Sequence, residues 1–108
     1  MKSKFLLILS VMFFSGVVFA DPWSGRVEIT HLYPYSDGLT FITNYENTEI
    51  STCANGARFS INKSHPNYTI LVSSMIAAFM SGKKINFKIS SGQQPSCEPE
   101  IDRFFIYN

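Results

Sequence analysis

The sequence predicts a β-rich α+β domain, a five-stranded OB-like barrel with one α-helix between the third and fourth strands. Three observations predict it. Five short runs alternate between apolar and polar residues, as half-buried strands do. One longer run, between the third and fourth of them, repeats its apolar residues at helical spacing instead. Three strands, a helix and two strands is the element order of the OB barrel; another small α+β sheet-plus-helix fold is the alternative.

Residues 1–20 predict an export signal rather than part of the fold. Two lysines precede an almost wholly apolar run over residues 5–19, which ends on a small-x-small sequence before Asp21. This is the three-part pattern of a secretory signal peptide, cleaved after Ala20. A membrane anchor is the alternative, although the apolar run is short for a transmembrane span. We therefore expect an exported protein, periplasmic or secreted, with a single domain over residues 21–108.

The first two strands form a predicted hairpin. Residues 25–33 alternate, with Val27 and Ile29 set between polar neighbours. Residues 34–38 end in Asp-Gly, a strong hairpin signal between β-prone runs. Residues 39–45 return as the second strand. A polar segment then precedes the third strand, at residues 57–62.

The predicted helix is indicated by six apolar residues at positions i, i+3, i+4, i+7, i+8 and i+11, a spacing that places them on one inward face of a helix. They are Tyr68, Leu71, Val72, Met75, Ile76 and Phe79. Pro66 suits the first turn, Ser64 or His65 can cap it, and Gly82 suits the stop. Residues 83–90 alternate cleanly as the fourth strand.

A Gly/Pro/Ser-rich loop over residues 91–100 separates the fourth strand from the last, at residues 103–107. This loop carries Cys97, and the segment before the third strand carries Cys53. An exported pair of cysteines with no third cysteine most simply forms one disulfide. A reactive dithiol lacks C-x-x-C spacing, and a zinc site lacks histidines at ligand spacing, so neither alternative is favoured.

Charge argues against a nucleic-acid partner. Of nine basic residues, two are the lysines of the predicted signal, so residues 21–108 carry seven basic and eight acidic residues, a net charge of −1. A protein that binds nucleic acid through its phosphates needs a basic surplus. We expect no nucleic-acid binding and no membrane span after the signal is removed.

The predicted helix has no charged face. No Asp, Glu, Lys or Arg lies between Pro66 and Gly82, whereas a surface helix normally turns charges to water. The hypothesis is a self-association or partner face that comprises Ile70, Ser74, Ala77, Met80 and Ser81. A solvated Ser/Ala-rich face with stray apolar residues is the alternative.

Aromatic residues near the first hairpin are the candidate ligand face: Trp23, Tyr33, Tyr35 and Tyr45. Their rings, with a few polar neighbours, suit a sugar or a peptide. Packing at the edge of a small core is the favoured alternative.

No catalytic constellation is evident. His31 and His65 accompany no activated nucleophile, and structural or surface roles are favoured for both. Glu98 and Glu100, beside the predicted disulfide, are weak evidence for a cation site. We expect neither a metal nor a cofactor.

Short motifs spread over nearly the whole of residues 21–108 support a resemblance. They are Gly25-x-Val27, the run from Tyr33 to Gly38, Cys53, His65-Pro66-Asn67-Tyr68, Ala77-Ala78, Ser81-Gly82-Lys83 and Cys97. With these motifs the chain resembles a group of short exported bacterial proteins. More distantly, its layout is similar to the B subunits of subtilase-cytotoxin-like and pertussis-like AB5 toxins. That resemblance implies rings of OB-like barrels whose helices line a pore and whose faces bind glycans, and it transfers no glycan-contacting residue.

These observations predict a non-enzymatic exported binding domain. The first hypothesis is a self-associating, B-subunit-like ring that presents its hairpin side to a glycan or receptor. The second is a monomeric periplasmic interaction or stress protein of unknown partner. An enzyme is the third, and it requires His31 or His65 in a cleft beside a carboxylate.

Overall fold

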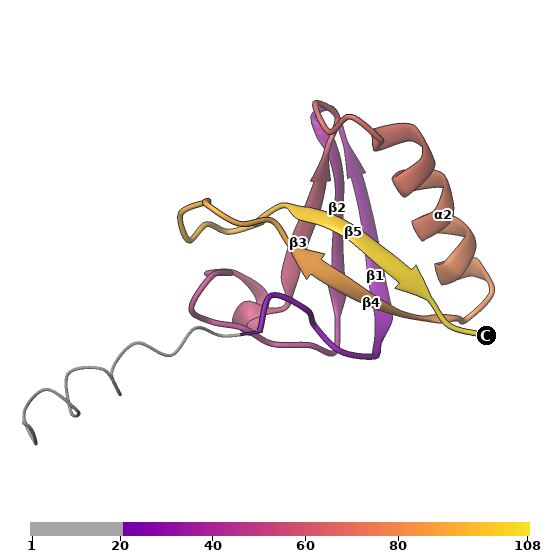
Figure 1. Ribbon diagram of the computed structural model, residues 1–108, viewed down its shortest axis with the longest axis horizontal. Helices are drawn as coiled ribbons and strands as arrows, with labels where there is room; N and C mark the ends of the chain where they lie inside the picture. Colours follow the sequence, from indigo (N-terminus) through magenta and orange to yellow (C-terminus); the bar gives the residue numbers. More distant parts are fainter. Residues whose placement is uncertain (1–20) are drawn as a thin grey trace, which may run out of the picture.

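The structure is a computed structural model that describes residues 21–108 (Figure 1). Its elements are β1 (Val27–Tyr35), β2 (Gly38–Thr43), the 3-10 turn η1 (Ala54–Gly56), β3 (Arg58–Asn62), α2 (Tyr68–Met80), β4 (Lys84–Ile89) and β5 (Ile101–Ile106). The predicted order of five strands and one α-helix is confirmed within these residues. The predicted signal peptide lies outside them. Several strand ends were placed wrongly by two residues: β1 spans Val27–Tyr35 rather than residues 25–33, β2 ends at Thr43 rather than Tyr45, and β5 begins at Ile101 rather than Arg103.

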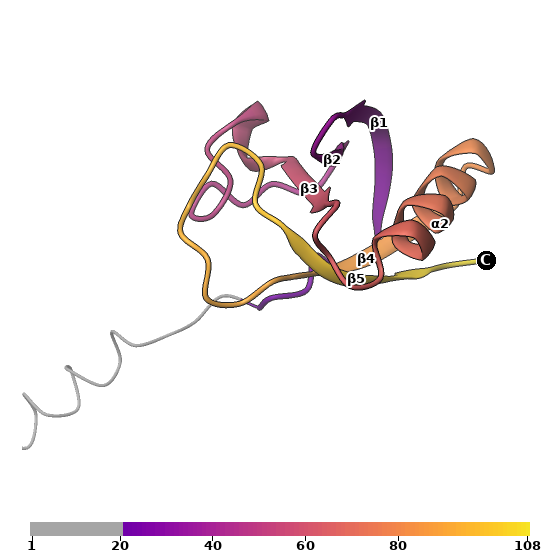
Figure 2. The same ribbon diagram turned by 90° about the horizontal axis from the view of Figure 1, so that it is seen from above.

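The five strands form one antiparallel sheet in the order β3-β2-β1-β4-β5. β1 lies at the centre because its two ends have different partners: Ile29–Tyr35 pair with β2, whereas Val27 and Glu28 pair with β4. A register shift between Ile29 and His31 marks an irregularity of the kind that bends a strand. The sheet therefore bends at β1, and Figure 2 shows β1 and β2 along one side of the molecule and β4 and β5 along the other.

The two edges of the sheet, β3 and β5, do not form a ladder. They approach each other at one isolated parallel bridge, Ser60 to Glu100, just before β5 begins. There the Ser60 amide donates to the carbonyl of Pro99 at 2.8 Å. The sheet is not closed by these contacts, so the predicted β-rich fold is confirmed but the barrel is not.

The hairpin is tighter than the sequence predicts, because β1 continues through Pro34 and Tyr35 to a two-residue turn. Tyr35 pairs with Gly38 across that turn, so the backbone nitrogen of Pro34 points away from β2. On that side of β1, β4 pairs only with Val27 and Glu28, so no strand lies beside Pro34. The missing N–H of proline therefore costs no ladder bond. Gly38 is required for a close approach: its φ is +155°, and a Cβ there would collide with the carbonyl oxygen of Ile61 in β3.

The core lies between the inward side of the sheet and α2. Its fully buried side chains include three phenylalanines, Phe41, Phe59 and Phe87. The Phe87 ring lies 4.9 Å from the Phe59 ring and edge-on to Phe41 at 5.3 Å, an arrangement that aromatic rings favour. This cluster ties β2, β3 and β4 together.

The helix is where predicted, but its inward face is turned by about one residue. Met75 is fully buried and Ala78 is 2% exposed, whereas Ile76, predicted to face inward, is 43% exposed. Leu71, Val72, Tyr68 and Phe79 are partly buried against the core, as predicted. The prediction for Ile76 was wrong because Met75 and Ala78 are the residues of α2 that face the core. Ile76 follows Met75 and is rotated from it by about 100° around the helix axis, away from the core.

Both ends of α2 are set by backbone contacts. Asn67, rather than Ser64 or His65, is the N-cap, and its side chain makes no capping hydrogen bond. At the other end, Gly82 has a φ of +67°, and Lys83 donates its amide to the carbonyl of Ala78 at 2.9 Å. This left-handed glycine stop confirms the role predicted for Gly82.

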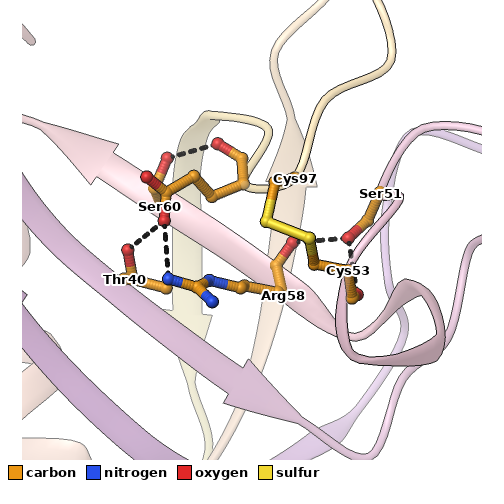
Figure 3. The surroundings of a disulfide bond; sticks show 7 residues. Thr40, Ser51, Cys53, Arg58, Ser60 and Cys97 are labelled. Atoms are coloured by element: carbon orange, nitrogen blue, oxygen red, sulfur yellow. Dashed lines mark hydrogen bonds and ion pairs between the residues drawn. A yellow bond between two sulfur atoms is a disulfide. The ribbon is translucent and has the colours of Figure 1, made fainter.

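The predicted disulfide is confirmed: Cys53 and Cys97 are bonded, across a sequence separation of 44. It joins the segment before β3 to the β4–β5 loop (Figure 3). Beside it, Thr52 donates to the carbonyl of Ser96 at 2.8 Å, and Ser96 donates to the carbonyl of Ile50 at 3.0 Å. The loop is therefore held to the segment before β3 by backbone hydrogen bonds as well as by the covalent link.

Candidate functional site

The four aromatic residues predicted as a ligand face do not share one surface. Tyr33 and Tyr35 lie together at the end of β1, with ring centroids 6.4 Å apart. Tyr45 is half-buried and packs on two core phenylalanines, so the packing interpretation holds for it. Trp23 forms a bridge to Lys88 of β4, away from the hairpin. The candidate ligand face therefore reduces to the two hairpin tyrosines and what surrounds them.

Alternation along the strands places Tyr33 in a row with two residues of the neighbouring strands. Tyr33 pairs with Thr40 of β2, and Thr40 pairs with Ser60 of β3. Leu39, Phe41, Phe59 and Ile61 point into the core, so this row points outward. Thr40 and Ser60 are nevertheless 1% and 2% exposed, because the β4–β5 loop crosses over them. The tyrosine ring at the end of the row stays 60% exposed.

Glu98, in that loop, connects the loop to the row. Its carboxylate accepts a hydrogen bond from the Thr40 hydroxyl at 2.7 Å and lies 3.2 Å from Nη2 of Arg58. Its carbonyl accepts from the Ser60 hydroxyl at 2.8 Å. Figure 3 shows Arg58 next to the disulfide, with its side chain directed towards Thr40. Glu98 immediately follows Cys97, and its hydrogen bonds to Thr40 and Ser60 hold it opposite Arg58.

The Arg58 guanidinium also reaches the exposed tyrosine, since its central carbon lies 5.7 Å from the Tyr33 ring centre. A cation over a tyrosine ring at this distance is an attractive contact. We call the five residues involved the tyrosine–arginine face: Tyr33, Tyr35, Thr40, Arg58 and Glu98. It combines an open aromatic ring with a charge pair whose side chains are each 32% exposed.

The protonation of this face is set by its surroundings. Burial raises the pKa of Tyr35 above its ordinary value, and the negative charge of Glu98 raises it further, while a hydrogen bond with Thr40 acts in the opposite direction. Tyr35 therefore keeps its proton and can donate a hydrogen bond. Within residues 21–108, the buried Nε of Arg58 has no hydrogen-bond partner. Glu98 thus satisfies only part of the guanidinium, and the unpartnered Nε lies on its buried side.

His31 lies in the row next to Tyr33, because it pairs with Ile42 and Ile42 pairs with Arg58, whereas His65 lies in the segment that enters α2. His31 is exposed, with Nδ1 2.9 Å from the Thr30 hydroxyl. Nδ1 of His65 accepts the amide N–H of Asn67 at 3.0 Å, so Nε2 carries the proton and donates to the carbonyl of Asp102 at 2.9 Å. His65 therefore fixes the loop that enters α2 against β5.

The carboxylates do not gather into a metal site. Over residues 21–108, no cluster of three or more His, Cys, Asp or Glu side chains is placed to hold a metal ion. Of the predicted pair, Glu98 turns to Arg58 and Thr40. No helix formed by the described residues is long and apolar enough to cross a bilayer.

The outer face of α2 is the second candidate. Of the residues predicted there, Ile70 is 66% and Met80 77% exposed, Ala77 and Ser81 are exposed, and Ser74 is half-buried. Ile76 joins them. α2 has no acidic or basic side chain along its length, so its exposed side is uncharged.

Sequence reasoning missed the partnership of Arg58 and Glu98. Arg58 was placed only within the third strand, and Glu98 was considered only as weak evidence for a cation site. The available signal was the disulfide, because Cys53 lies five residues before Arg58 and Cys97 immediately precedes Glu98.

Compared with protein-family models, curated proteins and solved structures, the chain has no significant match. The functional argument therefore rests on the two surfaces themselves.

Proposed function

We propose that this chain is an exported, non-enzymatic binding domain that binds a glycan or receptor at the tyrosine–arginine face. One observation carries the proposal. An open tyrosine ring lies beside a charge pair whose donors and acceptors are fixed by the sheet, the loop and the disulfide. An apolar surface with a few oriented polar groups is the usual composition of a binding site. Preorganised side chains on strands also bind with little loss of entropy.

The arrangement of the strands supports the same proposal. We take the sheet to be an OB-like barrel whose closing contact is the bridge between Ser60 and Glu100. The strand order and the position of α2 after β3 agree with that fold. OB barrels bind oligosaccharides and oligonucleotides on the face of their second and third strands and at the β4–β5 loop. Here Thr40, Arg58 and Glu98 come from those elements.

Export is part of the proposal. The apolar run over residues 5–19 supports a signal peptide. A disulfide between the only two cysteines supports an oxidising compartment, which is the periplasm or the outside of the cell.

The direct test is a glycan array probed with wild-type protein and with paired variants. Tyr33→Ala removes the ring and should weaken binding about two- to ten-fold, because aromatic contacts contribute about 0.5–1.5 kcal/mol. Tyr33→Phe keeps the ring and should bind within about two-fold of wild type. Phe105→Ala, which removes an exposed ring elsewhere, is the matched control and should bind normally. Unchanged binding by Tyr33→Ala contradicts the proposed site.

The uncharged face of α2 favours a second function, self-association or contact with a protein partner. Large apolar side chains at Ile70, Ile76 and Met80 are exposed on one helix. A B-subunit-like ring predicts that the wild-type protein is an oligomer by light scattering and that Ala77→Arg dissociates it. A monomeric interaction protein of unknown partner predicts the same mass for both proteins. A monomeric wild type therefore excludes the ring and leaves the ligand site untouched.

A further inference from the structure

The outward side of β4 and β5 gathers cations and aromatic rings. On β4, alternate lysines turn outward because Ile85, Phe87 and Ile89 are buried. The outward residues of β5 lie directly opposite, and the segment before β1 adds a tryptophan and an arginine to this surface. These residues form the basic face: Trp23, Arg26, Lys84, Lys88, Arg103 and Phe105.

The charges of the basic face are only partly balanced, since Glu28 lies directly opposite Lys84 in the register of β1 and β4 but forms no ion pair with it. Lys88 lies directly opposite Arg103 in the register of β4 and β5, although like charges at such positions destabilise a sheet. Arg103 is 3.7 Å from Asp102, but no ion pair among residues 21–108 includes Arg26, Lys84 or Lys88. Four of the seven basic residues of a segment with net charge −1 thus share one surface. Arg103 is compensated by Asp102 and by the Trp23 ring, but no ion pair compensates Lys88, and a local rule broken in this way points to a function.

The rings on this face are already stacked. Trp23 stacks on Phe105, with centroids 5.1 Å apart and planes at 12°. The Arg103 guanidinium lies 5.7 Å from the Trp23 ring, and that of Arg26 lies 4.7 Å from the Tyr107 ring. A base or a sugar stacks on a free ring face, and the facing sides of Trp23 and Phe105 are already in contact with each other. What the face offers outward is the hydrocarbon of Phe105, which is 57% exposed, surrounded by cations.

From this combination we infer that the basic face docks on the surface of an anionic lipid bilayer. Tryptophan and phenylalanine enter the headgroup region, where amphipathic aromatic rings accumulate. The four cations meet the lipid phosphates, and the lysine stems extend along the apolar boundary. The protein lies on the membrane without crossing it. The tyrosine–arginine face is formed by residues of β1, β2 and β3 and by Glu98 of the β4–β5 loop, whereas the basic face lies on β4 and β5 (Figure 2), so the tyrosine–arginine face stays free for its ligand.

The test uses the chain expressed with its own residues 1–20 and purified from the bacterial periplasm, with its N-terminus checked by mass spectrometry. Vesicles of phosphatidylcholine are compared with vesicles that also contain phosphatidylglycerol. Trp23 is the single tryptophan of the chain, so its fluorescence reports on the centre of the face. We expect a blue shift and co-sedimentation with the anionic vesicles, and neither with phosphatidylcholine alone or with inorganic phosphate.

Variants locate the contact. Lys84→Ala and Lys88→Ala should each weaken partition into anionic vesicles about five-fold, the usual effect of one cation at such a surface. Lys63→Ala is the matched control, because Lys63 lies outside the basic face and 3.9 Å from Asp37; it should change partition less than about two-fold. Phe105→Ser keeps the charge and should weaken partition about ten-fold through lost apolar burial.

Four results with vesicles overturn the inference. They are binding to neutral vesicles as tight as to anionic ones, absence of any shift with anionic vesicles, equal effects of Lys63→Ala and Lys88→Ala, and wild-type partition by Phe105→Ser. Tighter binding to single-stranded DNA or heparin than to anionic vesicles at the same salt concentration also overturns it, since the partner would then be a soluble polyanion.

Discussion

Removing the disulfide should destabilise the protein by a predictable amount. The bond between Cys53 and Cys97 closes a loop with a sequence separation of 44, which contains β3, α2 and β4. Loop-closure entropy for this length corresponds to about 4 kcal/mol in the unfolding free energy. The total unfolding free energy of small domains is roughly 5–15 kcal/mol. The double variant Cys53→Ala/Cys97→Ala should therefore remain folded in water but lose a large share of its stability.

The folded structure of that variant should be nearly unchanged, because the loop keeps its other contacts. The Ser60 amide still donates to Pro99, and the Ser60 hydroxyl to Glu98, both at 2.8 Å. Glu98 therefore stays opposite Arg58. The disulfide contributes mainly by restricting the unfolded chain, and the double variant should bind its ligand normally while it is folded.

Equilibrium unfolding in urea measures this directly. The unfolding free energy of the double variant should fall by about 4 kcal/mol, with a somewhat larger slope in urea, because its unfolded chain is less compact. Reduced wild-type protein is the control and should match the double variant. A loss below about 1 kcal/mol would refute the loop-entropy reasoning. A loss of ligand affinity in the folded variant would refute the view that hydrogen bonds alone can hold the loop.

Three further predictions concern single residues. Gly38→Ala should lower the unfolding free energy measured in urea by about 3 kcal/mol, because the new methyl group collides with the backbone of β3 at a positive φ. The control is Gly92→Ala, where nothing lies within 4 Å of the new methyl group, and it should lower that free energy by only about 1 kcal/mol. Met75→Ala removes a fully buried side chain and should lower the unfolding free energy by about 3 kcal/mol. Met80→Ala, at an exposed position, should lower it by less than about 0.5 kcal/mol. Equal losses of unfolding free energy would contradict the helix orientation. The pKa of Tyr35 is raised in the folded state, so the unfolded chain loses this proton first as pH rises above about 10. Unfolding free energy should therefore fall with pH in that range, and less steeply in Tyr35→Phe; identical slopes would contradict the shift.

The strands could be predicted because one side of each is buried. In β4 the alternating residues Ile85 and Phe87 are fully buried and Ile89 is 8% exposed, so period two was visible in the sequence. The end of the hairpin could not be predicted as well. Pro34 is tolerated inside β1 only because no strand lies on its other side, and strand order is not written in a local pattern.

The helix shows the limit of apolar periodicity. The pattern predicted its position, but it counted Ile76 as inward and gave no weight to Ala78, which is almost fully buried. Alanine carries little hydrophobic signal, yet it permits the close approach of a helix to a sheet. The rotation of a helix is decided by packing, so the sequence predicts it only to within about one residue.

The candidate site depended on contacts between distant parts of the chain. The sequence grouped Trp23 with the hairpin tyrosines by proximity along the chain, whereas Trp23 pairs with β4 instead. Arg58 and Glu98 meet only because a loop folds across the outside of the sheet. The paired cysteines were the one sequence feature that indicated this crossing.

The central claim is that ligand binds at the tyrosine–arginine face, and chemical-shift mapping tests it most directly. Backbone amide spectra of isotope-labelled protein are recorded during titration with a glycan selected on the array. We predict that the largest shifts fall at Tyr33, Thr40, Arg58 and Glu98, and that α2 is unaffected. Shifts concentrated on α2, with those four residues unchanged, would contradict the claim.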